Sequence, residues 1–159
     1  MKKAFLLLFA ILMATACATQ QQRAEERQQK AQQMTEAIAN RQLHIDVSDM
    51  STLRYGSHRV TSDFFLELRG DTLVSYLPFL GQAYQTATYG TPSQGLNFTA
   101  PVEKLVETHH KRGMTRLEML VSSQEDRFLY RLELYPNGQA YIQVRSQHRD
   151  PVSFNGTCN

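Results

Sequence analysis

The run of apolar and aromatic residues at positions 72–84 constrains the fold most, because it is the densest such run outside the N-terminus. Its first half has the composition of a strand, and Gly70-Asp71 just before it is a two-residue hairpin signal. Pro78 cannot donate a backbone hydrogen bond to a sheet, and Gly81 follows it closely. We therefore expect a strand that pairs with its predecessor and then turns sharply out of the sheet.

Alternation of apolar and polar residues predicts further strands, since a period of two places every second side chain on one face of a sheet. Pro101 is expected to separate two of these strands, and Asn137-Gly138 predicts a hairpin with a type I′ turn. A polar loop with a weak strand is expected between residues 49 and 62. The other predicted strands are residues 43–47, 64–68, 73–77, 96–99, 102–108, 117–121, 128–134 and 140–144, with an edge strand at 150–156.

The order of these elements indicates a mainly β protein of the α+β type, with one N-terminal helix and seven to nine strands. Consecutive strands that are joined by hairpins pair as antiparallel neighbours. The sequence shows no alternation of strands and helices of the βαβ kind. The sheet is therefore expected to be a twisted antiparallel meander, curled into a half-barrel, a barrel or a sandwich.

The N-terminus has the pattern of a secretory leader. Lys2 and Lys3 precede an unbroken apolar run at residues 4–13, which is too short to span a membrane as a helix. The following Ala-Thr-Ala-Cys resembles the lipobox of bacterial lipoproteins, although Ala14 stands where leucine is usual. The resemblance implies a signal peptide at residues 1–16 and lipid attachment at Cys17. The alternative is an ordinary secretory signal that happens to end at a cysteine.

The residues after Cys17 are expected to form a tether at 17–22 and a spacer helix at 23–40, ahead of an antiparallel β domain at 41–159. Good helix formers dominate the helical segment, and Met34 and Ile38 form part of a narrow apolar stripe on its second half. We expect the last turns of the helix to dock on the β domain. The first turns should be solvated and hold the domain away from the membrane.

Charge and cysteine content exclude two classes of protein. The chain has 17 basic and 15 acidic residues. Because Lys2 and Lys3 belong to the leader, the mature chain is formally neutral, and we expect no nucleic-acid partner. Cys17 and Cys158 are the only two cysteines, so a disulfide-stapled scaffold is excluded. If Cys17 bears lipid, Cys158 is a free thiol or pairs with another molecule; without lipid, a bridge between the two remains open.

A family resemblance appears at residues 75–84, Ser-Tyr-Leu-Pro-Phe-Leu-Gly-Gln-Ala-Tyr. This motif resembles the signature of domain of unknown function 4251, a family of small bacterial lipoproteins, and the stretches at 95–98 and 138–156 are similar to its later motifs. Leu80 stands where the family commonly has an aromatic residue, and Gln82 where a basic one is common. The resemblance implies a fold and an envelope location. Because the family has no established activity, it supplies no catalytic residues.

Candidate chemistry is sparse. None of the five histidines has the spacing of a metal site; they are His44, His58, His109, His110 and His148. No nucleophile elbow or phosphate-binding glycine loop is present, and we expect neither metal nor cofactor. Five aromatic residues cluster in sequence around the Pro78 corner and could line an apolar ligand pocket, or else belong to the core; they are Tyr76, Phe79, Tyr84, Tyr89 and Phe98. The polar loop at 85–95 is a second candidate for recognition.

The sequence therefore favours a lipid-anchored cell-envelope protein with a non-enzymatic binding or structural role. Its expected partners are the membrane, through the lipid anchor, and an envelope protein or small apolar ligand. The alternatives are a lipocalin-like carrier of an apolar molecule and, less favoured, an envelope hydrolase. By analogy with bacterial sorting signals, Ala18 after Cys17 favours the outer membrane, facing the periplasm.

Overall fold

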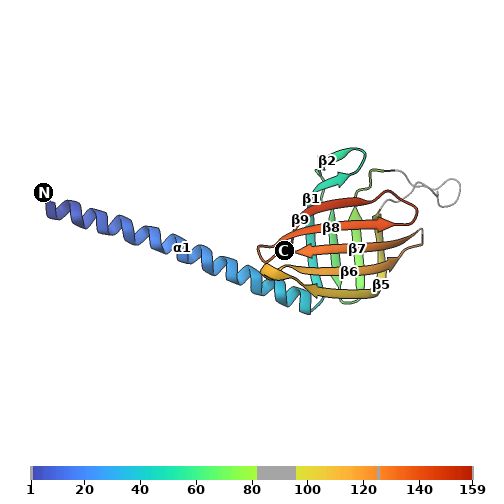
Figure 1. Cartoon of the computed structure of the whole chain (residues 1–159), viewed down its shortest axis with the longest axis horizontal. Coiled ribbons are helices and arrows are strands. Elements are labelled where there is room, and N and C mark those ends of the chain that lie inside the picture. Colours follow the sequence, from blue (N-terminus) through green and yellow to red (C-terminus); the bar gives the residue numbers. More distant parts are fainter. Residues whose placement is uncertain (1, 82–95, 125, 159) are drawn as a thin grey trace.

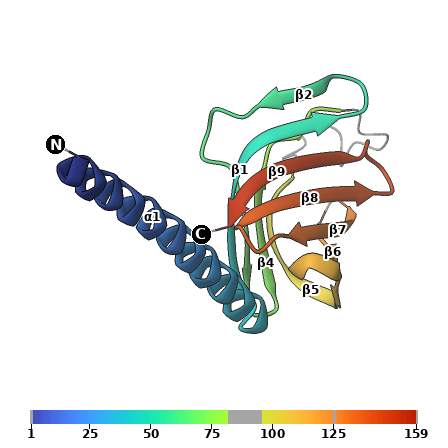
Figure 2. The same cartoon turned by 60° about the vertical axis from the view of Figure 1, so that its left-hand side comes forward.

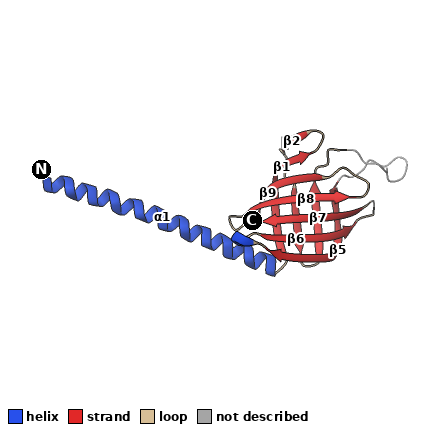
Figure 3. Ribbon diagram, in the orientation of Figure 1, coloured by secondary structure: helices blue, strands red, loops and turns tan. Residues whose placement is uncertain are grey.

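The computed structural model describes residues 2–81, 96–124 and 126–158, with side chains described from Gln20 onward. One long helix precedes an antiparallel β domain (Figures 1 and 3). In the described part of the chain the elements are α1 (Lys2–Ala39), β1 (Gln42–Thr52), β2 (Gly56–Arg59), β3 (Phe65–Arg69), β4 (Thr72–Leu77), β5 (Leu96–His109), the short 3₁₀ helix η1 (Lys111–Gly113), β6 (Thr115–Ser122), β7 (Arg127–Leu134), β8 (Gln139–Ser146) and β9 (Val152–Cys158).

The strands form a meander that closes on itself. Their order is β2-β1-β3-β4-β5-β6-β7-β8-β9, and an additional pairing joins β1 to β9. Eight strands thus close into a barrel, and β2 pairs only with the last residues of β1, from Asp49 to Thr52. The predicted meander is confirmed, and the barrel is one of the three forms expected for it. The prediction of an edge strand at 150–156 was wrong, because β9 lies between β8 and β1.

Strand β5 replaces the two strands that were predicted on either side of Pro101. Its first part pairs with β4, up to the pair Thr72–Pro101, and its second part pairs with β6, starting at Val102 opposite Val121. Proline therefore stands where the strand changes partners, and a register shift follows between Val102 and Lys104. The missing N–H of proline is tolerated there because the ladder is already interrupted.

Two hairpins form where glycine was expected to permit them. Gly70, with φ of 60°, lies in the turn between β3 and β4, as Gly70-Asp71 predicted. Gly138, with φ of 86°, lies between β7 and β8, and its N–H donates to the Tyr135 carbonyl oxygen at 2.9 Å. Asn137 does not have positive φ, so the predicted type I′ turn is wrong. Pro136 at the second position of this turn favours a type I turn followed by glycine instead.

Large apolar side chains fill the barrel interior. Along β6, β7 and β8 the residues alternate between buried and half-buried positions, as a two-residue period requires. The largest fully buried side chains are Ile45, Leu66, Leu73, Leu77, Leu96, Leu117, Met119, Phe128, Tyr130, Leu132, Leu134 and Phe154. Together with Ile142 on β8, which is also fully buried, they come from all eight barrel strands, so the interior is a packed core.

Helix α1 docks only through its last turns. Met34 and Ile38 are buried against the barrel core, as the apolar stripe predicted, whereas residues 20–30 are exposed. The helix ends at Ala39. Arg41, with a positive φ of 52°, then turns the chain into β1, and it pairs with Asp71 in the β3–β4 turn. Figures 1 and 2 show the helix beside one end of the barrel, with its N-terminal half projecting away.

The helix is continuous through residues 17–22, where the sequence predicted a tether. Alanine and glutamine in this segment are good helix formers, and neither proline nor glycine interrupts it. A spacer that begins at Cys17 is therefore helical from its first residue in this structure. Processing of the leader before Cys17 stays a prediction.

Candidate functional site

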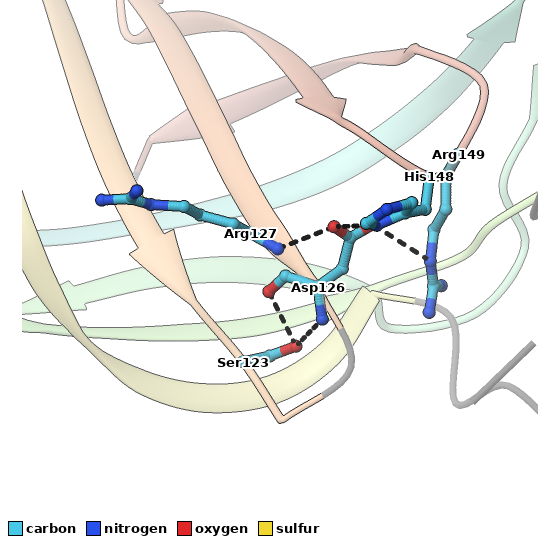
Figure 4. Close-up of polar contacts among 5 residues, drawn as sticks. All are labelled: Ser123, Asp126, Arg127, His148 and Arg149. Atoms are coloured by element: carbon cyan, nitrogen blue, oxygen red, sulfur yellow. Dashed lines mark hydrogen bonds and ion pairs between the residues drawn. The ribbon is translucent and has the colours of Figure 1, made fainter. Parts of the chain in front are cut away.

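The end of the barrel opposite α1, here called the barrel mouth, holds a cluster of polar side chains around a buried aspartate and a buried arginine. Asp126 lies in the turn between β6 and β7, and His148 and Arg149 lie in the loop between β8 and β9 (Figure 4). The side chain of Asp126 is 2% exposed and that of Arg149 is 6% exposed. The two loops are far apart in sequence, and the cluster connects them.

The β6–β7 turn fixes the carboxylate of Asp126. Ser123 N–H donates to the Asp126 carbonyl oxygen at 2.9 Å, and Asp126 N–H donates to Ser123 Oγ at 3.2 Å. Arg127 N–H donates to Asp126 Oδ1 at 2.7 Å. The first two bonds fix the backbone of the turn, and the third orients the carboxylate of Asp126.

The β8–β9 loop supplies two partners for this carboxylate, the imidazole of His148 and the guanidinium of Arg149. His148 Nδ1 lies 3.1 Å from Asp126 Oδ1, and Arg149 Nε lies 4.0 Å from Asp126 Oδ2. Oδ2 has no hydrogen-bond partner among the described residues. Its interaction with Arg149 is therefore an ion pair without a direct hydrogen bond.

The pKa of Asp126 lies below its ordinary value. Burial alone would raise it, but the Ser146 hydroxyl, the Arg127 N–H and His148 favour the charged form and together outweigh burial. Asp126 is therefore ionised at neutral pH. A buried carboxylate that remains charged stabilises the cationic side chain beside it.

Aromatic rings enclose the guanidinium of Arg149. Its central carbon lies 5.5 Å from the ring centroid of Phe79 and 5.8 Å from that of Phe128, both within cation–π range. Phe98 stacks on Phe128 with centroids 5.2 Å apart. The cluster thus joins the corner after β4 to strands β5 and β7 as well as to the β8–β9 loop.

Beneath this layer, the Tyr130 hydroxyl lies inside the barrel. It is 3.0 Å from Ser75 Oγ, which donates to the Leu96 carbonyl oxygen at 2.6 Å. Burial raises the pKa of Tyr130 far above the neutral range, so its phenol is uncharged. The pair satisfies two polar groups that the packed core would otherwise leave without partners.

Of the five aromatic residues that were predicted as a pocket, Tyr76 and Phe98 line one surface pocket of about 350 Å³. Phe79 and Phe98 belong to the mouth cluster. Tyr76 is on the outer face, 43% exposed, where its ring packs against Phe64 and Phe65. Tyr84, Tyr89 and the loop at 85–95 lie outside the described residues.

Side chains fill the interior next to the mouth cluster, and Phe79 and Phe98 are half-buried and pack against this core. Tyr130 and Phe154 are fully buried there, and Phe128 is almost so. This packing speaks against a lipocalin-like carrier, which needs an open cavity inside its barrel.

The mouth cluster contains a serine, a histidine and an aspartate, but their geometry differs from that of a nucleophilic triad. A triad needs a histidine nitrogen on the serine hydroxyl. Ser123 Oγ is instead bonded to the backbone of Asp126, and Figure 4 shows Ser123 and His148 on opposite sides of that residue. Among the described residues, no group of three or more His, Cys, Asp or Glu side chains could hold a metal ion.

Sequence inspection missed Asp126, His148 and Arg149 because each belongs to a loop and their contacts span more than 20 residues. The only local signal was Ser123 followed three residues later by Asp126, a spacing typical of side chain-to-backbone turns. Pairing that turn with the β8–β9 loop requires the barrel itself.

No helix in the part of the chain that the structure describes is both long and apolar enough to cross a membrane. A comparison with curated proteins finds no match. Among solved structures, the chain is similar to the crystal structure of a DUF4251 family protein from Bacteroides eggerthii, with a TM-score of 0.59 and 15% sequence identity. The match covers 81% of this chain and 86% of that one, and at this identity it shows the fold alone.

The family model for DUF4251, a domain of unknown function, matches residues 25–158, which is most of the chain. The motif around Pro78 had suggested the same family. The chain therefore belongs to the DUF4251 family.

Proposed function

We propose that the chain is a lipid-anchored envelope protein whose barrel is a non-enzymatic binding or structural module. Cys17 carries the lipid, residues 17–39 form the spacer, and the outer membrane, on its periplasmic side, is the location. The observation that carries the proposal is the one-sided docking of α1, which is exposed over residues 20–30 and buried only near Met34 and Ile38.

The spacer sets a distance between membrane and barrel. From Cys17 to Ala39 an α-helix rises about 33 Å, at 1.5 Å per residue. Its polar, exposed surface has no apolar face that would hold it along a bilayer. A barrel attached at the far end of such a helix has its mouth directed away from the anchor, where partners in the periplasm can reach it.

The packing of the barrel supports a non-enzymatic role. The interior is filled, the mouth cluster is locked by ion pairs and ring contacts, and Ser123 is engaged by the backbone. Hydrolysis of a panel of esters, peptides or glycosides by the purified full chain, with loss of activity in His148→Gln, would contradict this role.

The anchor is tested by separating soluble and membrane fractions of the native host. The variant carries Cys17→Ala behind an ordinary cleavable secretory leader. It should move from the outer-membrane fraction to the soluble periplasm, because each buried lipid methylene contributes about 0.8 kcal/mol to membrane binding. Cys158→Ala with the native leader is the matched control and should stay in the membrane. Membrane association of the Cys17→Ala variant would show that another element anchors the chain.

A further inference from the structure

The outer face of the barrel holds a groove of about 460 Å³ across β8, β9 and the last residues of β1. Its floor is made by Ser51 and Ser153, which are paired directly across β1 and β9, and by Gln143, which is paired with Ser153 across β8 and β9. The small serine side chains leave room above the sheet. The volume lies within the range of roughly 300–1,000 Å³ that is typical of ligand sites.

The groove has apolar walls above this polar floor. Leu53, in the turn after β1, is 85% exposed and lines the groove together with Tyr141 on β8. Pro151, in the loop that carries Arg149, also lines the groove. Polar groups on the floor and apolar surfaces on the walls suit a ligand with hydroxyl groups and an apolar ring face.

The charge of the groove is positive. Arg145 and Arg149 line it, whereas no aspartate or glutamate does. Arg145 is exposed and has no ion pair with any residue in the described ranges. The nearest acid along the chain, Asp150, pairs with Arg54 at 3.3 Å. Asp126 balances the charge of Arg149, so the unpaired positive charge of the groove comes from Arg145.

Arg149 connects the groove to the mouth cluster. Its guanidinium is held by Asp126 and lies over two phenylalanine rings, so its position is fixed before any ligand arrives. Arg145, in contrast, is free to rotate towards a bound anion. One preorganised and one adjustable arginine, beside serine hydroxyls, form a set of donors that suits carboxylate or phosphate oxygens.

We propose that this groove binds a small polyhydroxylated molecule that bears a carboxylate or phosphate group. Arg145 pairs with the anionic group, Ser51, Gln143 and Ser153 bind hydroxyl groups, and Tyr141 packs against the ring face. The site does not depend on the lipid anchor, and it gives the barrel a ligand that differs from the apolar one expected from the sequence.

The test is an amide NMR titration of the full chain in detergent micelles. Three probes share one sugar framework: sodium glucuronate carries a carboxylate, glucose 6-phosphate carries a phosphate, and glucose is neutral. The anionic probes should cause saturable shifts at the amides of Ser51, Gln143 and Ser153, and glucose should not. The stronger of the two anions identifies the charged group of the natural ligand.

Arg145→Gln should weaken binding of the anionic probes about tenfold, since a hydrogen bond to a charged group is lost. Arg59→Gln is the matched control, because Arg59 is an exposed arginine on β2 outside the groove, and it should leave binding unchanged. Ser51→Leu, which fills the floor, should abolish the shifts. The proposal is overturned by equal shifts with glucose, by equal affinity in Arg145→Gln, or by the absence of saturable shifts at these amides.

Discussion

The two ends of the barrel are closed by different physical means. At the helix end, Met34 and Ile38 of α1 bury apolar surface against the core. At the mouth, Asp126 and Arg149 form a buried ion pair, and Phe79 covers the guanidinium. The first closure is non-directional and depends on area, whereas the second depends on the distances and orientation of a few atoms.

This difference divides the tasks of the two ends. The apolar contact of Met34 and Ile38 holds the helix on the barrel without fixing the conformation of any loop. An ion pair between two loops fixes both, and here it also positions Arg149 beside the outer groove. The helix end therefore suits the attachment that we propose, and the mouth positions Arg149 beside the surface that is proposed to bind a ligand.

The largest effect is expected from neutralising the carboxylate at the mouth. Asp126→Asn should lower the free energy of unfolding by about 3 kcal/mol, because it leaves the buried charge of Arg149 without its carboxylate. Urea unfolding followed by circular dichroism measures this change. The matched control is Glu118→Gln, which removes a carboxylate from a half-exposed pair with Arg131 and should cost less than about 1 kcal/mol.

Equal losses of unfolding free energy in Asp126→Asn and Glu118→Gln would contradict the distinction between the two ends of the barrel. They would show that the mouth pair contributes no more than an ordinary surface ion pair. If Asp126→Asn lowers the free energy of unfolding and also removes binding of the anionic probes in the outer groove, the comparison becomes sharper. The position of Arg149 would then be shown to depend on Asp126.

Most of the fold was predictable from local patterns. Residues 128–134 alternate cleanly and form β7, and Gly70 marks a turn because its positive φ is unfavourable for other residues. Closure was not predictable. Residues 150–156 show the pattern of an edge strand, but β9 pairs with β1 about 100 residues away, and no local signal reports such a partner. At Gly156 an added Cβ would collide with the Asp46 carbonyl oxygen, so this glycine permits the close approach of the two strands.

The candidate sites were less predictable than the fold. Phe79 and Tyr76 are three positions apart in sequence, yet one covers Arg149 and the other lies on the outer face. Sequence clustering could not distinguish them, because Pro78 turns the chain between the two. Arg145 is an exposed polar residue on β8, and it gained significance only when closure placed Ser51 and Ser153 beside it.

A smaller effect is expected at the helix end. Ile38→Ala should lower the free energy of unfolding by about 2 kcal/mol, near the lower end for truncation of a buried aliphatic side chain, because only one side of the helix contacts the barrel. Gln33→Ala, at an exposed position of the same helix, should change it little. Thermal unfolding of both variants measures the contrast. A similar free energy of unfolding for Ile38→Ala and Gln33→Ala would mean that α1 is not docked in solution.

The smallest effect is a difference in pH dependence between the two ends. Asp126 has a lower pKa folded than unfolded, where about 3.9 is usual. Its contribution is therefore fully present above about pH 4 and is lost as the pH falls through the folded pKa. The difference in free energy of unfolding between the wild type and Asp126→Asn should shrink in this acid range. The effect is smaller than that of the substitution itself, because the lowered pKa of Asp126 leaves the carboxyl only partly protonated until the pH falls below that pKa.

The helix end supplies the control for this titration. The difference between the wild type and Ile38→Ala should stay constant over the same acid range, because an apolar contact has no proton to gain. Urea unfolding at a series of pH values measures both differences. If both stay constant, Asp126 is not coupled to folding through its charge. If both shrink together, acid weakens the barrel as a whole, and the ionic closure of the mouth is not distinct from the apolar closure at α1.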